Sequence, residues 1–254
     1  MLAQERYNKI QELLLSDNVV RVSKLTTLFG VSLETVRRDL EHMEGQGLLK
    51  RVYGGAVLSE NSENQPTRVK RQAVLTEQKR EIAELVCRYI CEGDSIAMDA
   101  STTNHVIASV LKTKFKSLTI LTNCLSIINE LSDMPDYKII IPGGILNTDE
   151  LSITGDFIER SLDNFRMNKM LISMSGISLR DGLTDFGFGE CQVKKKMISI
   201  SRELYVVADS TKFGKVSLIK VCDFQDINMI ITDSKLSETI KQAFVKEGVE
   251  IVNS

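Results

Sequence analysis

The 254-residue chain lacks the sequence features of membrane proteins and secreted proteins. No apolar run approaches the ~20 residues that a helix needs to span a bilayer. The first ten residues, MLAQERYNKI, do not show the basic and then apolar layout of a secretory signal. We therefore expect a cytoplasmic protein without a membrane partner.

Cysteine and histidine are scarce, and this argues against a metal site or a disulfide framework. The five cysteines are scattered, no CxxC pair is present, and the two histidines are His42 and His105. The sequence thus predicts a reduced compartment, no metal and no cofactor. Cys87 and Cys91 stand four residues apart on one face of an expected helix, and we expect both to be small core residues.

A surplus of positive charge is also missing. The chain has 32 Lys and Arg residues against 34 Asp and Glu residues, for a formal net charge of −2. This balance argues against nucleic-acid binding over the whole surface, but it permits a local DNA-binding face. Residues 1–58 contain eight basic and seven acidic side chains, so their placement is more informative than their sum.

Three short helices are expected near the start of the chain. Amphipathic patterns cover residues 3–16 and 21–30, and the second ends at Gly30, typical of a left-handed cap. Ser32 is then a good N-cap for a third helix, where Glu34 suits the helix dipole. Two helices joined by a tight glycine turn form the helix-turn-helix layout.

The periodicity also predicts which side chains of these helices face the core. They are Tyr7, Ile10, Leu13 and Leu14 in the first helix, Leu25, Leu28 and Phe29 in the second, and Leu33, Val36, Leu40 and Met43 in the third. Thr35, Arg38 and His42 lie opposite that last stripe, with Arg37 on its flank. Taken alone, these polar residues fit a solvated helix face equally well.

A basic hairpin is expected next, over residues 48–57, with Lys50 and Arg51 before a turn at Gly54 and Gly55. Such a hairpin is typical of the wing of a winged-helix domain, where basic residues contact phosphates. A three-helix interaction module is the alternative for residues 1–58. The order of glycine turn, helix cap, outward arginines and basic hairpin favours a DNA-binding domain.

The rest of the chain predicts a linker and a larger α/β domain. Residues 59–72 are polar and without apolar periodicity, as in a linker, and helical periodicity resumes in the domain over 73–254. Seven short apolar runs alternate with helical patterns, which predicts a mostly parallel sheet with helices on both faces. The runs are 95–99, 118–122, 137–142, 170–175, 204–209, 227–232 and 249–252, and the helices are 104–112, 124–132, 155–163, 190–201 and 236–247.

Four of these runs end in small, polar or cationic residues. The residues are Asp99, Ser101, Thr102 and Thr103 after the first run, Asn123 after the second, Gly143 and Gly144 after the third, and Ser210, Thr211 and Lys212 after the fifth. Ligands bind at the carboxyl ends of strands in such sheets, and hydroxyls at a helix start suit a phosphate. Helix caps and turns alone would explain each residue singly, but the set predicts an anion-binding pocket.

The segment VSLETVRRDLEHMEGQGLLKRVYGGAV (31–57) resembles the DNA-binding segment of the DeoR family of bacterial transcriptional regulators. Its pattern is S-x-x-T-[VI]-R-R-D-L-x-x-L-E-x-x-G-x-[LI]-x-R-x-[HY]-G-G-A, and Met43 replaces the usual leucine. The resemblance implies that Ser32, Thr35, Arg37 and Arg38 face DNA. An arginine can donate two hydrogen bonds to guanine, although Arg37 has the alternative of pairing with phosphate or with Glu41.

The larger domain resembles the sensor domain of the same family, on the segments DASTTN, TN, PGG, GECQVKKKM and ADSTKFG. The resemblance implies a fold similar to ribose-5-phosphate isomerase and coenzyme A transferases, and a phosphorylated sugar or related metabolite as effector. The implied contacts are Asp99, Ser101, Thr102, Thr103, Asn123, Gly144, Glu190, Lys194 and Lys212. One departure is Ala100, which stands where glycine is usual.

An isomerase that carries a DNA-binding domain is the alternative function. Aldose–ketose isomerisation needs a general base, and Lys194 stands at the expected position, with Glu190 one turn earlier. The lysines at 194–196 suit a phosphate better than a carboxylate base, and His105 has no obvious partner. We therefore expect a regulator rather than an enzyme: a homodimeric or homotetrameric repressor of carbohydrate-metabolism genes that binds a DNA operator.

Overall fold

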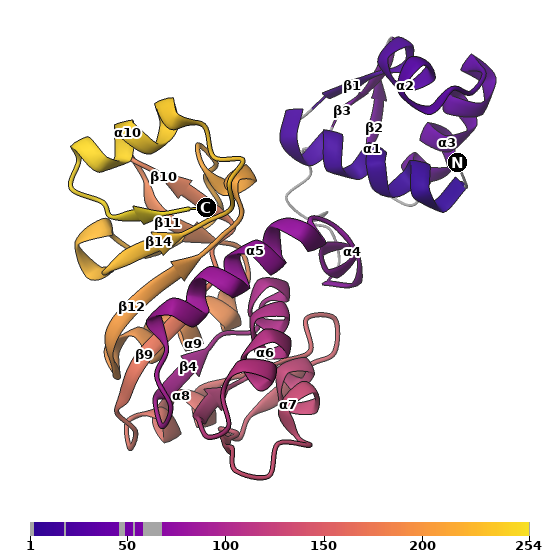
Figure 1. Ribbon diagram of the computed structural model, residues 1–254. Helices are drawn as coiled ribbons and strands as arrows, with labels where there is room; N and C mark the ends of the chain where they lie inside the picture. Colours follow the sequence, from indigo (N-terminus) through magenta and orange to yellow (C-terminus); the bar gives the residue numbers. More distant parts are fainter. Residues whose placement is uncertain (1–2, 18, 46–48, 53, 58–67, 254) are drawn as a thin grey trace. The chain divides into compact units, whose positions relative to one another are not determined.

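The computed structural model describes residues 3–17, 19–45, 49–52, 54–57 and 68–253. The chain divides into two compact units, Met1–Leu75 and Thr76–Ser254 (Figure 1). Most of the predicted linker, residues 59–67, lies outside the described residues. Its last part is helical, because α4 (Arg68–Ala73) covers it. The domain boundaries predicted from the sequence therefore stay a prediction.

In its described residues before α4, the N-terminal unit contains three helices and a three-stranded antiparallel sheet. Its elements are α1 (Ala3–Asp17), β1 (Val19–Arg21), α2 (Val22–Phe29), α3 (Leu33–Gly45), β2 (Lys50–Val52) and β3 (Gly55–Val57), with strand order β1-β3-β2. The predicted helices and the hairpin of β2 and β3 are confirmed. Strand β1 was not expected, because three residues directly before a helix are too short to show alternation.

Two glycines allow the close turns of this unit. Gly30 has φ +63° and its N–H donates to the Thr26 carbonyl at 3.0 Å, as expected for a left-handed cap between α2 and α3. Gly55 passes so close to β1 that a Cβ atom would stand 2.0 Å from the Val20 carbonyl oxygen. The turn thus sets the position of α3, and the second glycine allows the hairpin to pair with β1.

The core of the N-terminal unit confirms most of the predicted apolar stripe and corrects two residues. The buried set is Ile10, Leu14, Val20, Leu25, Phe29, Val36, Leu40, Met43, Leu49 and Ala56. Leu28 and Leu33, however, are 51% and 49% exposed. They flank the turn at Gly30, and a helical wheel does not show whether another element covers a helix end.

The C-terminal unit is built on a seven-stranded parallel sheet, which confirms the predicted α/β class. Its strands are β4 (Ser95–Met98), β5 (Thr119–Thr122), β6 (Lys138–Ile140), β9 (Met167–Ile172), β12 (Ser201–Val207), β14 (Met229–Ile231) and β15 (Ile251–Val252), and each lies within or overlaps one predicted run. The helices are α5 (Thr76–Val86), α6 (Thr102–Lys114), α7 (Leu125–Leu131), α8 (Asp156–Leu162), α9 (Phe188–Ser199) and α10 (Glu238–Lys246).

Successive side chains along each strand point to opposite faces of the sheet, and they form two hydrophobic cores, one on each face. In β4, Ile96 and Met98 pack with α5, α6 and α7, whereas Ala97 packs on the opposite face with α8, α9 and α10. Both faces are covered, as a parallel sheet requires (Figure 1).

Five further strands were not predicted. β10 (Gly176–Ser178), β11 (Gly182–Asp185) and β13 (Ile219–Cys222) form an antiparallel sheet, and β7 (Ile145–Asn147) pairs with β8 (Ser152–Thr154) in a two-stranded ribbon. They have four residues or fewer and contain polar and glycine positions, so no apolar run marks them. Both small sheets bring side chains toward the carboxyl ends of the main strands.

The seven strands are parallel and have the order β15-β14-β12-β9-β4-β5-β6. The direction in which the chain adds successive strands to this sheet changes between β4 and β9. Chain order runs outward from β4 through β5 and β6 on one side, and through β9, β12, β14 and β15 on the other. The following helices accordingly leave toward opposite faces, α6 toward one core and α9 toward the other. Such a switch point is where open α/β sheets bind ligands.

Neither Cys87 nor Cys91 is a fully buried core residue. A short 3-10 turn, Cys87–Tyr89, follows α5, and Cys91 lies beyond it. Cys87 is half-buried and Cys91 is exposed, so the prediction is wrong for Cys91. The helix ends too early for the two thiols to share its face.

Candidate DNA-binding and effector sites

Helix α3 presents Arg37 and Arg38 to solvent. Both side chains are exposed, and neither has a hydrogen bond or ion pair with another residue in the described part of the chain. Ser32 caps the helix, since its Oγ accepts the Thr35 N–H at 3.2 Å and lies 2.9 Å from the Thr35 Oγ1. The two arginines are therefore available to a partner, and the two hydroxyls hold the start of the helix.

Unlike Arg37 and Arg38, the predicted wing residue Arg51 forms ion pairs within the protein. The Arg51 guanidinium lies 2.6 Å from Glu44 at the end of α3 and 3.8 Å from Glu41. The Glu44 carboxylate also accepts the Arg51 backbone N–H at 2.7 Å, so Arg51 ties the hairpin to α3. Glu41 thus pairs with Arg51 and not with Arg37. The side chain of Lys50 lies outside the part of the chain that the structure describes.

Asp39, within the Arg-Arg-Asp run, is a structural residue that the sequence reasoning missed. Its carboxylate accepts two hydrogen bonds from Arg6 of α1, at 2.6 and 2.9 Å, and both side chains are buried. Asp39 lies on the apolar stripe of the helix between Val36 and Met43, and a charged residue at such a position predicts a buried partner. This ion pair joins α1 to the helix that carries Arg37 and Arg38.

In the C-terminal unit, the ends of β4 and β9 meet at the switch point. Asp99 follows β4, and its Oδ1 accepts the N–H of Ser173, which follows β9, at 3.0 Å. The same oxygen accepts the Asn104 side-chain N–H at 2.5 Å, and Asn104 also donates to the Leu171 carbonyl at 2.8 Å. Asp99 is therefore held rigidly between the two strands and the first turn of α6.

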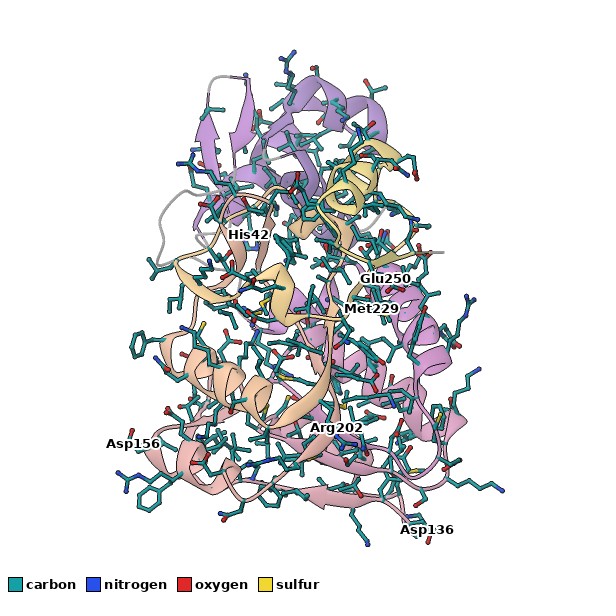
Figure 2. All side chains as sticks on the ribbon, turned by 90° about the vertical axis from the view of Figure 1, so that its left-hand side faces the viewer. His42, Asp136, Asp156, Arg202, Met229 and Glu250 are labelled. Carbon is teal, nitrogen blue, oxygen red and sulfur yellow. The ribbon has the colours of Figure 1, made fainter. Side chains whose placement is uncertain are left out.

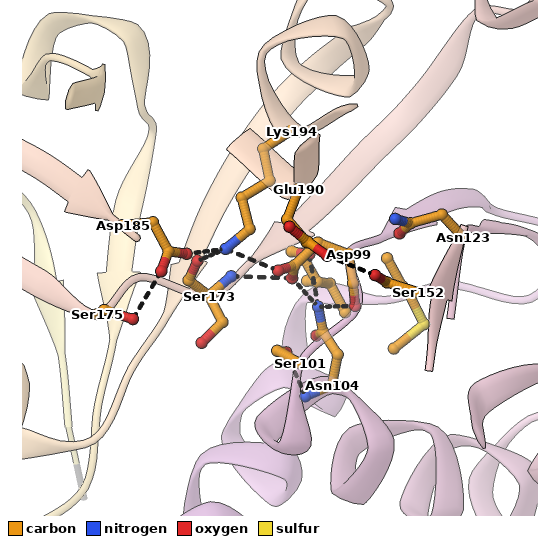
Figure 3. Close-up of polar contacts among 12 residues, drawn as sticks. Asp99, Ser101, Asn104, Asn123, Ser152, Ser173, Ser175, Asp185, Glu190 and Lys194 are labelled. Carbon is orange, nitrogen blue, oxygen red and sulfur yellow. Dashed lines mark hydrogen bonds and ion pairs between the residues drawn. The ribbon is translucent and has the colours of Figure 1, made fainter. Parts of the chain in front are cut away.

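Lys194 reaches this point from α9 on the other face of the sheet (Figure 3). Its ammonium is ion-paired with Asp99 at 2.9 Å, donates to the Ser173 carbonyl at 2.5 Å and pairs closely with Asp185 of β11. All three charged side chains are buried. An ammonium has three N–H donors, and three protein oxygens surround this one.

The charges in this cluster shift one another's pKa. Burial alone would lower the pKa of Lys194, but Asp185 and Asp99 together raise it above its ordinary value. Burial would raise the pKa of Asp185, but Lys194 and hydrogen bonds from Ser175 and Phe186 lower it. For Asp99, burial raises the pKa and Lys194 offsets only part of the rise. With both carboxylates ionised the cluster has a net charge of −1.

Two buried amide oxygens near the switch point have no hydrogen-bond donor among the described residues. They are Oδ1 of Asn104 and Oδ1 of Asn123, which follows β5. Ser101 caps α6 through a 3.1 Å hydrogen bond from the Asn104 N–H. The N–H groups of Thr102 and Thr103 have no acceptor within the helix, because they lie in its first turn.

The β7–β8 ribbon is hydrogen-bonded to α9 through Glu190. The Glu190 carboxylate accepts hydrogen bonds from Asn147 at 3.0 Å and from Ser152 at 2.7 Å, as Figure 3 shows for Ser152. Gly144 is required by packing, since a Cβ atom there would stand 2.6 Å from the Thr154 carbonyl oxygen. Glu190 thus joins α9 to the ribbon.

Lys212 follows β12 in a short turn, Ser210–Lys212, which Asp209 caps by accepting the Thr211 N–H at 3.1 Å. Lys212 is half-buried, and its ammonium has no ion pair with any described residue. Burial and the nearby charge of Lys212 lower the pKa of Lys215, a second cation that the sequence reasoning did not select. The segment lies against β10 and β11, since the Gly214 N–H donates to the Ile177 carbonyl of β10 at 2.8 Å and the Ser217 N–H donates to Thr184 of β11 at 2.8 Å.

The side chains named for the isomerase alternative have other partners. His105 lies 3.6 Å from Glu130, which corrects the expectation that it has no partner. Lys194 stands between two carboxylates, which the adjacent lysines had not suggested. Within the described residues, no group of three His, Cys, Asp or Glu side chains is arranged to hold a metal ion.

The same part of the chain contains no helix that is long and apolar enough to cross a membrane. Among solved structures, ribose 5-phosphate isomerase A from Neisseria gonorrhoeae aligns with a TM-score of 0.41 at 14% identity, over 54% of this chain and 53% of that one. This likeness is too slight to bear on activity.

Residues 6–62 match the DeoR-like helix-turn-helix domain, and residues 75–234 match the DeoR C terminal sensor domain. The HTH-type transcriptional regulator YulB of Bacillus subtilis is 35% identical over 99% of this chain and 96% of its own length. The HTH-type transcriptional regulator GolR of Listeria innocua is 31% identical over 99% and 98%, and the glycerol-3-phosphate regulon repressor of Escherichia coli is 30% identical over 99% of both chains. The chain therefore belongs to the DeoR family and is a DNA-binding transcriptional regulator.

Proposed function

We propose that this regulator represses carbohydrate-metabolism genes and that a phosphorylated sugar, bound at the β4–β9 switch point, controls its affinity for the operator. The observation that carries the proposal is the set of unsatisfied groups that follow the carboxyl ends of β4, β5 and β12, along the same edge of the sheet. Among the described residues, two buried amide oxygens lack donors, two first-turn N–H groups lack helical acceptors, and Lys212 lacks a counter-charge. The glycerol-3-phosphate regulon repressor of Escherichia coli supports the ligand class by its name.

These groups match the two ends of a sugar phosphate. Sugar hydroxyls are hydrogen-bond donors that suit the Oδ1 atoms of Asn104 and Asn123. The start of α6 and the ammonium of Lys212 suit the phosphate. Buried polar groups without partners are costly, so a ligand that satisfies them gains that free energy on binding.

Lys194 has a different part in this proposal from the one predicted by resemblance. Its donors already face three protein oxygens, and the cluster around it has a net charge of −1 when both carboxylates are ionised. A phosphate would gain little attraction there. We therefore assign Lys194 the role of positioning Asp99 and Asp185, while Lys212 and the start of α6 contact the anion.

The protein in this proposal is not an enzyme. Isomerisation needs a base that removes a proton from carbon, and Lys194, at the position expected for that base, is raised in pKa and remains protonated. Asp185 is held as an ion-paired carboxylate of lowered pKa, which makes it a weak base. Measurable conversion of any pentose or hexose phosphate by the purified protein would refute this part of the proposal.

Replacing Arg38 with alanine is expected to weaken operator binding by ~1–3 kcal/mol and to relax sequence preference, because a bidentate contact to guanine would be lost. A gel-shift titration on a DNA fragment selected by the wild-type protein measures both effects. Arg88→Ala removes the same charge from an exposed site in the C-terminal unit and serves as the control. Wild-type affinity and selectivity in Arg38→Ala would exclude base reading by this residue.

Replacing Lys212 with alanine should leave operator affinity unchanged and abolish its response to the effector, because the phosphate loses its counter-charge. Operator binding is measured by fluorescence anisotropy across a concentration series of each sugar phosphate. Lys246→Ala, an exposed lysine of α10, is the matched control and should respond like the wild type. If Lys212→Ala responds at the same effector concentration as the control, the phosphate is not bound there.

The same proposal places the protein in the cytoplasm as a homodimer or homotetramer. A regulator must reach chromosomal DNA, and winged-helix readers of repeated half-sites act as symmetric oligomers. The small positive surplus of residues 1–58 agrees with this, because one copy has few cations to neutralise phosphates.

A further inference from the structure

Three large apolar side chains of the C-terminal unit are exposed around the junction of β8 and α8. Ile145, Phe157 and Phe188 are 72%, 81% and 73% exposed. They come from β7, α8 and the start of α9, and we call them the junction patch.

The three elements of the junction patch are brought together by contacts at Thr154 and Gly155. Ile145 pairs with Thr154 in the ribbon, and its Cδ1 lies 3.7 Å from the position that a Cβ on Gly155 would take. On the α9 side, a Cβ on Gly189 would stand 3.1 Å from the Cβ of Thr154. Phe188 precedes Gly189, and Phe157 is the second residue of α8, so both lie close to the same junction.

The area of the junction patch matches that of the largest apolar patch on a typical monomer. Full burial of an aromatic side chain covers about 150–250 Å², so Phe157 and Phe188 together offer roughly 300 Å², and Ile145 brings the patch to roughly 400 Å². Contiguous apolar patches of this size on monomers are often functional. A stable interface buries about 800 Å² on each partner, and the patch alone supplies about half of that.

The patch continues into an open strand edge. In the described part of the chain β7 pairs only with β8, so its other edge presents unpaired backbone groups. An open edge is a template for pairing with another strand. Two identical strands can pair antiparallel about a two-fold axis, which makes the surface complementary to itself.

From these observations we infer that a second copy of this chain docks on the junction patch, through an isologous contact that includes the edge of β7. The inference rests on the proposed function for the need of a second copy, because repeated DNA half-sites require two protomers. It also links the interface to the effector. Glu190 of α9 binds Asn147 and Ser152 of the same ribbon, so a ligand beside Glu190 can shift the strand that the partner contacts.

Sedimentation velocity of the full chain without DNA or effector tests the interface. Phe157→Ser is expected to raise the dimer dissociation constant ~100-fold, because an isologous contact loses the aromatic anchor on both sides. Val245→Ser, on α10, is the control: it is 44% exposed and apolar. Figure 2 places Asp156, beside Phe157, and Glu250, after α10, at opposite ends of the C-terminal unit.

Circular dichroism must show that both variants are folded, and Ile145→Ser gives a second test if Phe157→Ser is not. A monomeric wild type at micromolar concentration would overturn the inference, and so would wild-type association in the folded patch variants. Because these readouts involve neither DNA nor effector, a failure of the proposed effector control would leave them unchanged.

Discussion

Replacing Lys194 with methionine is expected to destabilise the C-terminal unit by about 3–5 kcal/mol, because removal of one partner leaves buried charge uncompensated. Asp99 and Asp185 would face each other without the ammonium that joins them. For a unit of this size the loss lowers the melting temperature by ~10 °C. Differential scanning calorimetry of the variant beside the wild type measures the shift.

Lys195→Met is the matched control for this prediction. Lys195 is the next residue of the same helix, but its side chain is exposed, so its loss should change stability by less than ~0.5 kcal/mol. A third variant, Lys194→Met combined with Asp185→Asn, should recover part of the lost stability. Equal melting temperatures of Lys194→Met and Lys195→Met would show that the buried cluster is not held by charge.

The pH dependence of the Lys194 variant follows from the same cluster. In the wild type the pKa of Asp185 is lowered, so its contribution to stability is present at neutral pH and is lost as the pH falls through the folded pKa. Without Lys194, burial dominates and both carboxyl groups prefer to be protonated. The difference in unfolding free energy between the wild type and the variant should therefore become smaller as the pH falls from about 8 to about 5.

Replacing Asp39 with alanine is expected to destabilise the N-terminal unit by about 3 kcal/mol, because the buried Arg6 loses its two hydrogen bonds to the Asp39 carboxylate. A unit of this length has a total stability of only ~5 kcal/mol. The loss should weaken DNA binding severely, although the Asp39 side chain is buried. Calorimetry should show a lower transition for this unit and an unchanged transition for the other.

The double variant Arg6→Met with Asp39→Leu separates loss of the pair from loss of packing. Apolar side chains of similar size often replace a buried ion pair at little cost, so the double variant should be more stable than Asp39→Ala. Operator binding should return with stability, because Arg37 and Arg38 remain on α3. A stable Asp39→Ala protein that does not bind DNA would instead indicate a direct role for Asp39.

The sequence was most informative where a physical pattern is local. The Gly30 turn, the Ser32 cap and the seven apolar runs predicted the helix-turn-helix and every strand of the main sheet. These features depend on residues within one element or next to it. The short strands β7, β8, β10, β11 and β13 were missed, because their stability comes from partners distant in sequence rather than from their own pattern.

The candidate site shows the same division between local and long-range information. The polar residues after β4, β5 and β12 could be predicted, since carboxyl ends of parallel strands share one edge. The ion pairs of Lys194 with Asp185, and of Arg6 with Asp39, could not. Their partners lie on different elements, so a lysine that resembles an anion contact proved to be enclosed by carboxylates.

Calorimetric titration of a sugar phosphate into the protein, alone and saturated with operator DNA, tests the central claim most directly. The claim is that one ligand at the switch point changes DNA affinity, and linkage requires that DNA change the affinity for that ligand by the same factor. We expect one sugar phosphate of a panel to bind, with affinities that differ between the free and DNA-bound protein by the factor seen in operator binding. Equal affinities in the two states, or no binding by any sugar phosphate, would contradict the account.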